Sequence, residues 1–174
     1  LKNALQKTSL SDTTQWIHFG LTSNDIIDNL YRILILEALN KIIIPEIESL
    51  QLFINNLAKT YLKLPMLGRT HGQPAVPTTF GKEMFVFSTR IDKELRNLKN
   101  TKLYGKFGGA IGNWNALNLA FPTKNWQLLS TMFLKHLGLE HSKITTQIAP
   151  TEDLIAVFQN IFRINSIIID FDQD

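Results

Sequence analysis

A long stretch almost free of helix breakers, residues 25–63, constrains the fold more than any other feature. Its apolar residues recur at intervals of three and four, the spacing that places them on one face of an α-helix. They are Ile27, Leu30, Leu34 and Ala38, and then Leu50, Ile54, Leu57 and Tyr61. Ser23 is a favoured N-cap, so a long helix is expected to start there. Pro45 has no backbone N–H and should kink this helix or divide it in two.

Between residues 33 and 44 this stretch is apolar on nearly every face. A helix on the surface of a single chain shows one apolar stripe, whereas a helix that is apolar all round is buried on all sides. A chain of 174 residues cannot easily wrap such a helix by itself. Neighbouring subunits are therefore expected to supply part of the cover. The alternative is an ordinary core helix of a larger monomer.

The rest of the chain also favours helices. Residues 1–22 are expected to form a short helical or irregular lead-in, and residues 64–79 an irregular loop around His71. The further helices expected from apolar spacing run from Thr78 or Thr79 to about Lys99, over roughly residues 126–137 as far as Gly138, and onward from Thr151. No strand pattern extends over more than a few residues, so the predicted fold class is mostly α.

Four glycines fall within residues 105–112 and are followed by Asn113, Trp114 and Asn115. No strand precedes them and their spacing is wrong for a phosphate loop or a dinucleotide fingerprint. The expected role of this segment is to let the backbone pack closely against another element.

Composition excludes several classes of function. The chain has no cysteine, which rules out disulfides, zinc–thiolate sites and thiol catalysis and suits a reducing compartment. No apolar run approaches the ~18 residues that cross a bilayer, and the N-terminus lacks a signal core. The expectation is a soluble, cytoplasmic chain with no membrane partner. Both ends look cut, because the chain opens on Leu1 and stops in helical register, so a fragment is expected.

The formal charge of +3 gives little support to nucleic-acid binding. A nucleic-acid binder concentrates Lys and Arg on one face. The densest basic stretch here lies at the presumed end of a helix, where cations complement the helix dipole without a partner. It comprises Lys93, Arg96, Lys99, Lys102 and Lys106. We therefore expect no nucleic-acid partner.

His71 is the first candidate for chemistry. It is followed by Gly72, which allows backbone angles that other residues avoid, and by Pro74 and Pro77, which hold the exit of the loop extended. Imidazole changes protonation near neutral pH, so a rigidly presented His is a natural general acid or base. The alternative is a solvated loop side chain.

Polar residues in three other segments are candidates for binding a ligand. Thr22 and Ser23 lie at the start of a helix, where hydroxyls and free backbone N–H groups suit an anion, although Ser23 could simply cap its helix. Asn113 and Gln147 carry amides that could orient a substrate or bond to their own turns. Lys82 falls in the first turn of a helix, an unfavourable place for a cation unless it holds a carboxylate or phosphate.

A metal site is not expected. The four histidines show neither paired i, i+4 spacing nor the usual carboxylate partners. His136 and His141 flank a helix end, where a dipole contact explains them. His18, between Ile17 and Phe19, is expected to be a packed core side chain.

Four ordered segments together resemble the adenylosuccinate lyase family of the fumarase/aspartase superfamily. They are residues 17–26 with Thr-Ser-Asn-Asp, residues 68–83 with Gly-Arg-Thr-His-Gly-Gln-Pro, residues 105–116 with the glycines, and residues 145–150 with Thr-Thr-Gln. The Gly-Gln-Pro after His71 is more similar to this family than to fumarase, aspartase or argininosuccinate lyase. The resemblance extends over nearly the whole chain.

The resemblance implies a long-helix bundle in which four identical subunits form a twenty-helix core. It implies elimination of fumarate from adenylosuccinate, giving AMP, and from the succinylated aminoimidazole carboxamide ribonucleotide of purine biosynthesis, with no metal or organic cofactor. His71 takes the position of the general acid. Thr22, Ser23 and Gln147 take substrate-binding positions, and Thr70, Lys82 and Asn113 lie within the same motifs.

The resemblance also implies a domain organisation. Residues 1–22 would end an N-terminal domain, and residues 23–174 would form part of the central helical domain. The family's general base, a Ser in a mobile loop, and its second His would lie outside this chain, so the fragment alone is expected to be inactive. The alternatives are another fumarate-releasing lyase of the superfamily and a helical assembly module without catalysis.

Overall fold

The helical stretch expected after Ser23 is present, and one π-helical turn interrupts it. In the computed structural model, which describes residues 1–173, it consists of three consecutive segments. They are α2 (Asn24–Ala38), the π-helical turn η2 (Leu39–Ile43) and α3 (Ile44–Thr60). The N–H of Ile44 bonds the carbonyl of Leu39, five residues back, and Pro45 follows with no N–H to donate. The predicted break at Pro45 is confirmed.

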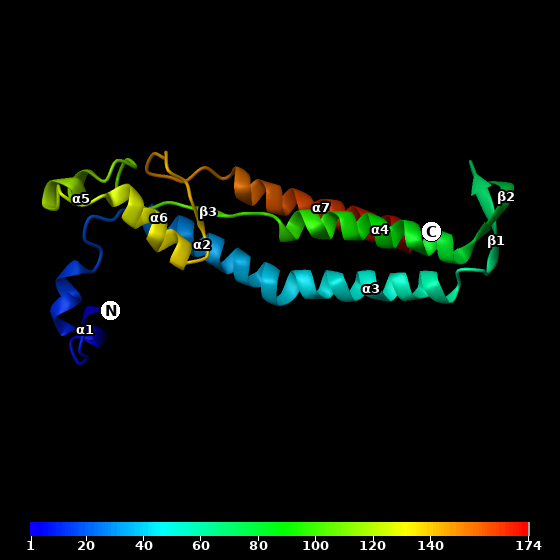
Figure 1. Cartoon of the computed structure of the whole chain (residues 1–174), viewed down its shortest axis with the longest axis horizontal. Coiled ribbons are helices and arrows are strands. Elements are labelled where there is room, and N and C mark those ends of the chain that lie inside the picture. The colour runs from blue at the N-terminus through cyan, green and yellow to red at the C-terminus, as the bar shows by residue number, and fades with distance from the viewer. Residues whose placement is uncertain (174) are drawn as a thin grey trace. The chain divides into compact units, whose positions relative to one another are not determined.

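The described chain forms two compact units, and the mostly α prediction is confirmed in both (Figure 1). One unit combines residues 1–35 with 102–151, and the other combines residues 36–101 with the chain from residue 152 onward. Each unit consists of residues that contact one another within this chain. The expected domain boundary near residue 23 concerns a longer protein and stays a prediction.

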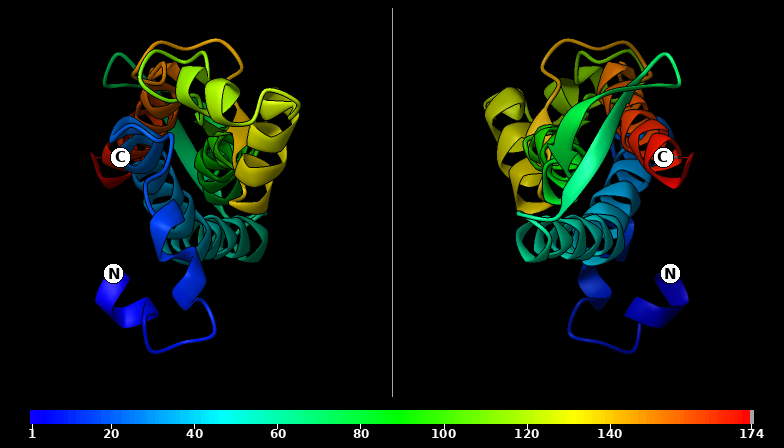
Figure 2. Two further views of the ribbon diagram at one scale, coloured as in Figure 1. Left: turned by 90° about the vertical axis from the view of Figure 1, so that its left-hand side faces the viewer. Right: turned by 90° about the vertical axis from the view of Figure 1, so that its right-hand side faces the viewer.

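The second unit is a packing of three helices around an apolar core. Helix α4 (Phe80–Lys99) packs against both α3 and α7 (Glu152–Gln173), which are seen nearly end-on in Figure 2. The core residues are Ile54, Phe87, Ile91 and Ile167. Thr79 caps α4 by accepting from the N–H of Lys82 at 3.3 Å, so the predicted start and end of this helix are confirmed.

The segment expected to be an irregular loop is a β-hairpin, so that prediction was wrong. Strand β1 (Pro65–Thr70) pairs antiparallel with β2 (Gln73–Thr79), with an irregularity between Leu67 and Arg69. Both strands are largely exposed, so neither shows the apolar–polar alternation that marks a half-buried strand. Both are also edge strands, which is why they tolerate proline.

The first unit begins with the expected short lead-in, α1 (Lys2–Leu5) and the 3₁₀-helix η1 (Ser11–Trp16), before α2 starts. Its later elements include two short parallel strands. Helix α6 ends two residues before Gly138, whose φ is +78°. The later elements are β3 (Tyr104–Gly105), α5 (Asn115–Ala120), α6 (Trp126–His136) and β4 (Glu140–His141). The buried leucines of this unit are Leu103, Leu117, Leu134 and Leu139.

Two sequence-based interpretations are corrected in this unit. His18 is exposed and has a φ of +66°, so it is not a packed core side chain. Lys106 does not belong to a solvated helix end, because α4 stops at Lys99 and Lys106 is fully buried in the segment that follows β3.

Helix α7 also departs from the expectation about apolar runs. By length and composition alone it could cross a membrane, although the core helix of a soluble protein satisfies the same criterion. Its residues Val157, Asn160, Ile164 and Ile167 are buried, and Asn160 and Arg163 both bond to Glu94 of α4. In this structure α7 is therefore a bundle helix with polar contacts to its neighbour.

Candidate active site

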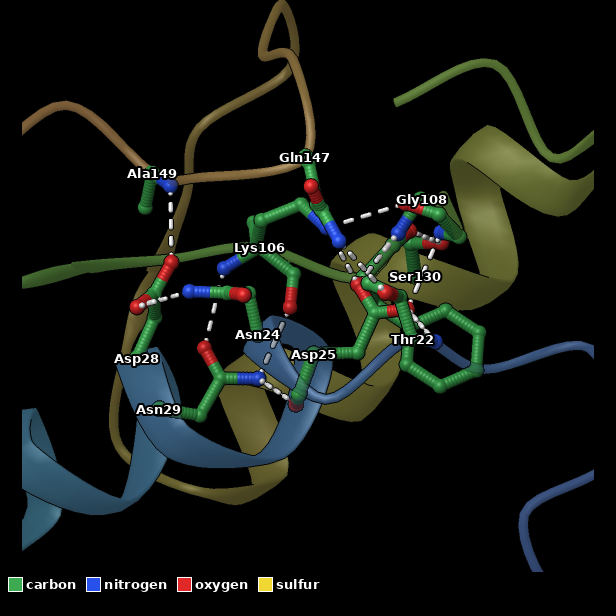
Figure 3. A network of polar contacts seen from close by, with 12 residues as sticks. Thr22, Asn24, Asp25, Asp28, Asn29, Lys106, Gly108, Ser130, Gln147 and Ala149 are labelled. Carbon is green, nitrogen blue, oxygen red and sulfur yellow. Dashed lines mark hydrogen bonds and ion pairs between the residues drawn. The ribbon is translucent and has the colours of Figure 1, made fainter. Parts of the chain in front are cut away.

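The carboxylate of Asp25 is the centre of a buried polar network in the first unit (Figure 3). Its Oδ1 accepts from the Lys106 ammonium at 2.6 Å and from the N–H of Gly108 at 3.0 Å. Its Oδ2 accepts from the N–H of Thr22 at 2.9 Å and from the N–H of Gly109 at 3.0 Å. A carboxylate has about four lone-pair sites, so this group is fully hydrogen-bonded.

The partner cation is equally well enclosed. Side-chain exposure is 1% for Lys106 and 0% for Asp25, and the ammonium also donates to the carbonyl of Gly109 at 3.2 Å. Buried charges are found in proteins when they are paired and hydrogen-bonded, and both conditions hold here. The segment around Gly105–Gly112 therefore packs closely against α2, as its glycines predicted. A Cβ on Gly105 would lie 2.5 Å from the side-chain oxygen of Asn29.

Three more residues of α2 tie later segments of the chain to the helix. Asn29 accepts from the N–H of Lys106 at 2.9 Å and donates to the carbonyl of Lys106 at 2.7 Å. Asp28 accepts from the N–H of Ala149 at 2.7 Å, and Arg32 donates to the carbonyl of Pro150 at 2.6 Å. Successive turns of α2 thus fix two segments that lie far along the sequence.

This anchoring brings together two of the predicted substrate-binding residues. The side-chain amide of Gln147 donates to the hydroxyl of Thr22 at 3.3 Å across 125 positions of sequence. Ser23 is exposed beside them at the start of α2. The anion site expected here is altered in one respect, because the N–H of Thr22 is already bonded to Asp25.

A pocket of about 460 Å³ opens next to this network. Three segments line it, namely residues 20–21, 109–111 and 115–116. The first of these segments precedes Thr22 directly, and the second begins at Gly109, whose N–H bonds Asp25. The pocket and the buried network therefore share their walls.

The comparisons with known proteins identify a family over nearly the whole chain. A family model described as "Lyase" matches residues 2–174. The chain belongs to this lyase family. Two solved structures share the long-helix fold of this chain. A β-carboxy-cis,cis-muconate cycloisomerase from Acinetobacter calcoaceticus aligns with a TM-score of 0.81 at 21% identity, covering 99% of this chain and 39% of that one. A fumarate lyase from Mesorhizobium aligns with a TM-score of 0.77 at 24% identity, covering 90% and 36%.

Curated relatives that bear the name adenylosuccinate lyase are similar at a higher level of identity. The Haemophilus influenzae protein is 39% identical over 175 residues, covering 100% of this chain and 38% of the relative. The Escherichia coli K12 protein is 38% identical over 165 residues, covering 95% and 36%. The Dictyostelium discoideum protein is 39% identical, covering 92% and 35%. The chain thus spans less than two-fifths of the length of these relatives.

In this chain His71 lies at the tip of the β1–β2 hairpin, in the second unit. Thr70 pairs with Gln73, so His71 and Gly72 are the two central residues of the turn, with φ values of +55° and +72°. Two positive φ values define a type I′ turn, which suits the twist of a hairpin. His is among the non-glycine residues that adopt this conformation most readily. The imidazole is exposed.

The remaining predicted site residues are placed as follows. Thr70 is exposed at the end of β1. Lys82 is in the first turn of α4 and pairs with Glu83 at 3.0 Å, which offsets the unfavourable position of the cation. Asn113 is exposed after the glycines, and its neighbour Asn115 lines the pocket. Thr22, Ser23, Asn113 and Gln147 share the first unit, whereas Thr70, His71 and Lys82 belong to the second.

Within residues 1–173 no cluster of His, Asp and Glu could hold a metal ion.

Sequence reasoning missed four polar residues of α2 that hold this network together, three of which are buried. The signal was present, because polar residues recur every three or four positions along an otherwise apolar helix. These residues are Asp25, Asp28, Asn29 and Arg32. Asp25 also lies in the first turn of α2, where an acid complements the helix dipole without any buried partner. A polar stripe on a helix that is otherwise apolar indicates buried hydrogen-bond partners elsewhere in the chain.

Proposed function

We propose that this chain is part of an adenylosuccinate lyase, which releases fumarate from adenylosuccinate to give AMP. The same enzyme would act on the succinylated aminoimidazole carboxamide ribonucleotide. The observation that carries this proposal is the 38–39% identity to relatives of that name over 92–100% of the chain. The structural neighbours are too distant in sequence to bear on the substrate.

The proposed reaction is a β-elimination in which His71 is the general acid. A base outside this chain removes the proton beside a carboxylate, and the carbanion is delocalised into that carboxylate. The C–N bond then breaks, its electron pair goes to nitrogen, and the His71 imidazolium gives its proton to that nitrogen. An anionic substrate nearby would favour the charged imidazole. The exposed position of His71 in a two-residue turn supports this role.

Thr22, Ser23 and Gln147 are the proposed substrate-binding groups. Gln147 uses one amide hydrogen on the Thr22 oxygen, which leaves its carbonyl as an acceptor and the Thr22 hydroxyl hydrogen as a donor. Hydroxyls at a helix N-terminus are well suited to a carboxylate. Thr70, Lys82 and Asn113 are proposed as further contacts. The two sets of residues would meet in a homotetramer, the assembly that the resemblance implies.

The decisive experiment is a substitution in the whole protein. His71→Ala should lower kcat by about 100-fold or more, the usual range for a lost acid–base group. The matched control is His136→Ala, which removes an exposed His from the last turn of α6. Fumarate release is followed with adenylosuccinate and with a panel of other succinyl and malyl compounds. A normal kcat for His71→Ala removes this residue from the mechanism, and turnover of another compound alone reassigns the substrate.

The 174-residue chain by itself is proposed to release little or no fumarate, because the base would lie outside it. Incubation of the chain with adenylosuccinate tests this proposal. Turnover near that of the whole enzyme would contradict it.

A further inference from the structure

We propose that Asp25 is a positioning residue that holds Thr22 at a fixed place relative to the glycine-rich segment, and that Lys106 neutralises its buried carboxylate. The inference deepens the proposed function and rests on it, since it explains how the backbone at Thr22, just before α2, is held in position. Neither residue needs to touch the substrate, because both are fully enclosed by the protein.

A single oxygen atom of Asp25 bonds two separate segments of the chain. Oδ2 of Asp25 accepts from the N–H of Thr22 at 2.9 Å and from the N–H of Gly109 at 3.0 Å. Thr22 follows one segment that lines the pocket, and Gly109 begins another. One atom therefore joins the residue that would bind the substrate to a wall of the pocket beside it.

Asn29 holds the glycine-rich segment at Lys106 without the help of Asp25, so Thr22 depends more on the carboxylate than that segment does. Asn29 bonds both backbone groups of Lys106, at 2.9 and 2.7 Å. The segment therefore has a fixed register on α2 without Asp25. Thr22 precedes the helix, and its backbone N–H is held by the Asp25 carboxylate. Loss of the carboxylate should free Thr22 and, through the Gln147 contact, that side chain as well.

The balance of charge distinguishes the two residues. The Lys106 ammonium lies 2.6 Å from Oδ1 and neutralises the carboxylate beside a site proposed to bind an anion. An unpaired Asp25 would repel such a ligand, and an unpaired buried Lys106 would destabilise the fold. The two single substitutions should therefore differ. Asp25→Asn strands a buried cation, whereas Lys106→Met leaves the carboxylate with its three N–H donors.

The first test uses the 174-residue chain and no ligand. The amide resonances of Thr22, Gly108 and Gly109 are compared in the wild type, Asp25→Asn and Lys106→Met. We expect all three amides to shift and to exchange faster in Asp25→Asn, and Thr22 to keep its protection in Lys106→Met. The control is Glu140→Gln, which breaks an exposed ion pair with Lys102 in the same unit. Unchanged amides in Asp25→Asn would overturn the proposal.

The second test uses the whole protein and separates positioning from stability. Asp25→Asn misplaces a binding group, and Lys106→Met leaves an uncompensated negative charge beside the proposed anion site. Each variant should therefore lower kcat/KM by about tenfold to 100-fold, mainly through KM. The double variant Asp25→Asn/Lys106→Met removes the stranded charge and should recover Tm but not KM. Recovery of both quantities together would mean a structural role only and would overturn the proposal.

The two proposals fail in different ways. If the wild-type protein does not act on adenylosuccinate, the proposed function is wrong and the amide measurements still decide the positioning role. If the wild type is active and Asp25→Asn matches Glu140→Gln in KM, the positioning role is wrong and the proposed function stands.

Discussion

At the scale of single residues, the backbone conformation of His71 and Gly72 determines where the imidazole lies. His71 and Gly72 have φ values of +55° and +72°, which close the hairpin in two residues. A Cβ placed on Gly72 would meet no atom within 4 Å, so space does not require glycine there. The requirement comes from the left-handed backbone alone.

Gly72→Ala is therefore expected to weaken the turn without disturbing the core. A left-handed conformation costs a residue with a side chain about 1 kcal/mol more than it costs glycine. The contacts between Thr70 and Gln73 should weaken in NMR spectra, and kcat of the whole protein should fall, while the Tm of the chain changes little. Val76→Ala, at an exposed position of β2, is the control. An unchanged turn in Gly72→Ala would contradict this account.

Some residues of the candidate site could be predicted from the sequence, and others could not. Thr22, Gln147 and His71 were identifiable as candidates from local context and motif. The pairing of Asp25 with Lys106 was not, because 81 positions separate the two residues. In the sequence, Lys106 follows other basic residues and is therefore expected to be solvated. Only the structure shows that it is buried. Only the polar spacing along α2 hinted that buried partners existed.

At the scale of elements, Glu94 links α4 to α7. Its Oε2 accepts from Asn160 at 2.7 Å and from Arg163 at 2.9 Å. Burial raises the pKa of the Glu94 carboxyl, but hydrogen bonds from Arg163 and Asn97 and the Arg163 charge outweigh burial and leave the pKa below 4.5.

The contact between α4 and α7 should therefore weaken in acid. The unfolded chain takes up the Glu94 proton at higher pH than the folded chain does, so the stability from Glu94 is complete above pH 4.5 and is lost as pH falls through the lower folded pKa. Thermal unfolding of the wild type and Glu94→Gln over this range measures the effect. The Tm difference between them should shrink on acidification, and a constant difference would exclude this role. Asp92→Asn, on an exposed ion pair of α4, is the control.

Helices were predicted well because their signal is local. The ends of α4 and α6 follow from caps and from Gly138, and the break near Pro45 follows from a missing donor. The β1–β2 hairpin was missed because both strands are exposed, so no buried face imposed a period of two on the sequence. An element that packs on one face has a periodic apolar pattern in its sequence. An element held only by backbone hydrogen bonds does not.

At the scale of the whole molecule, much apolar surface is left uncovered on a single chain. Among the apolar residues from 33 to 44 only Leu39 is buried, and Leu34 and Ile42 are more than half exposed, at 53% and 62%. Helix α7 has a second apolar stripe besides the one in the core. It comprises Ile155, Phe158, Phe162 and Ile169. Two apolar stripes on one helix explain why α7 is hydrophobic enough to satisfy a membrane criterion while packing in a bundle.

These exposed stripes predict that the chain associates with itself. Burial of one Phe contributes about 1.5–3 kcal/mol, so Phe162→Glu should raise the dissociation constant roughly tenfold or more. Phe162 is 71% exposed on its own chain, so the substitution should leave the fold intact. Ile144→Glu is the control, because Ile144 is 91% exposed but lies outside the helices. Sedimentation velocity over a range of concentrations measures the effect. A wild-type chain that stays monomeric at every concentration, or a Phe162→Glu variant that associates as the wild type does, would show that these stripes are not interfaces between subunits.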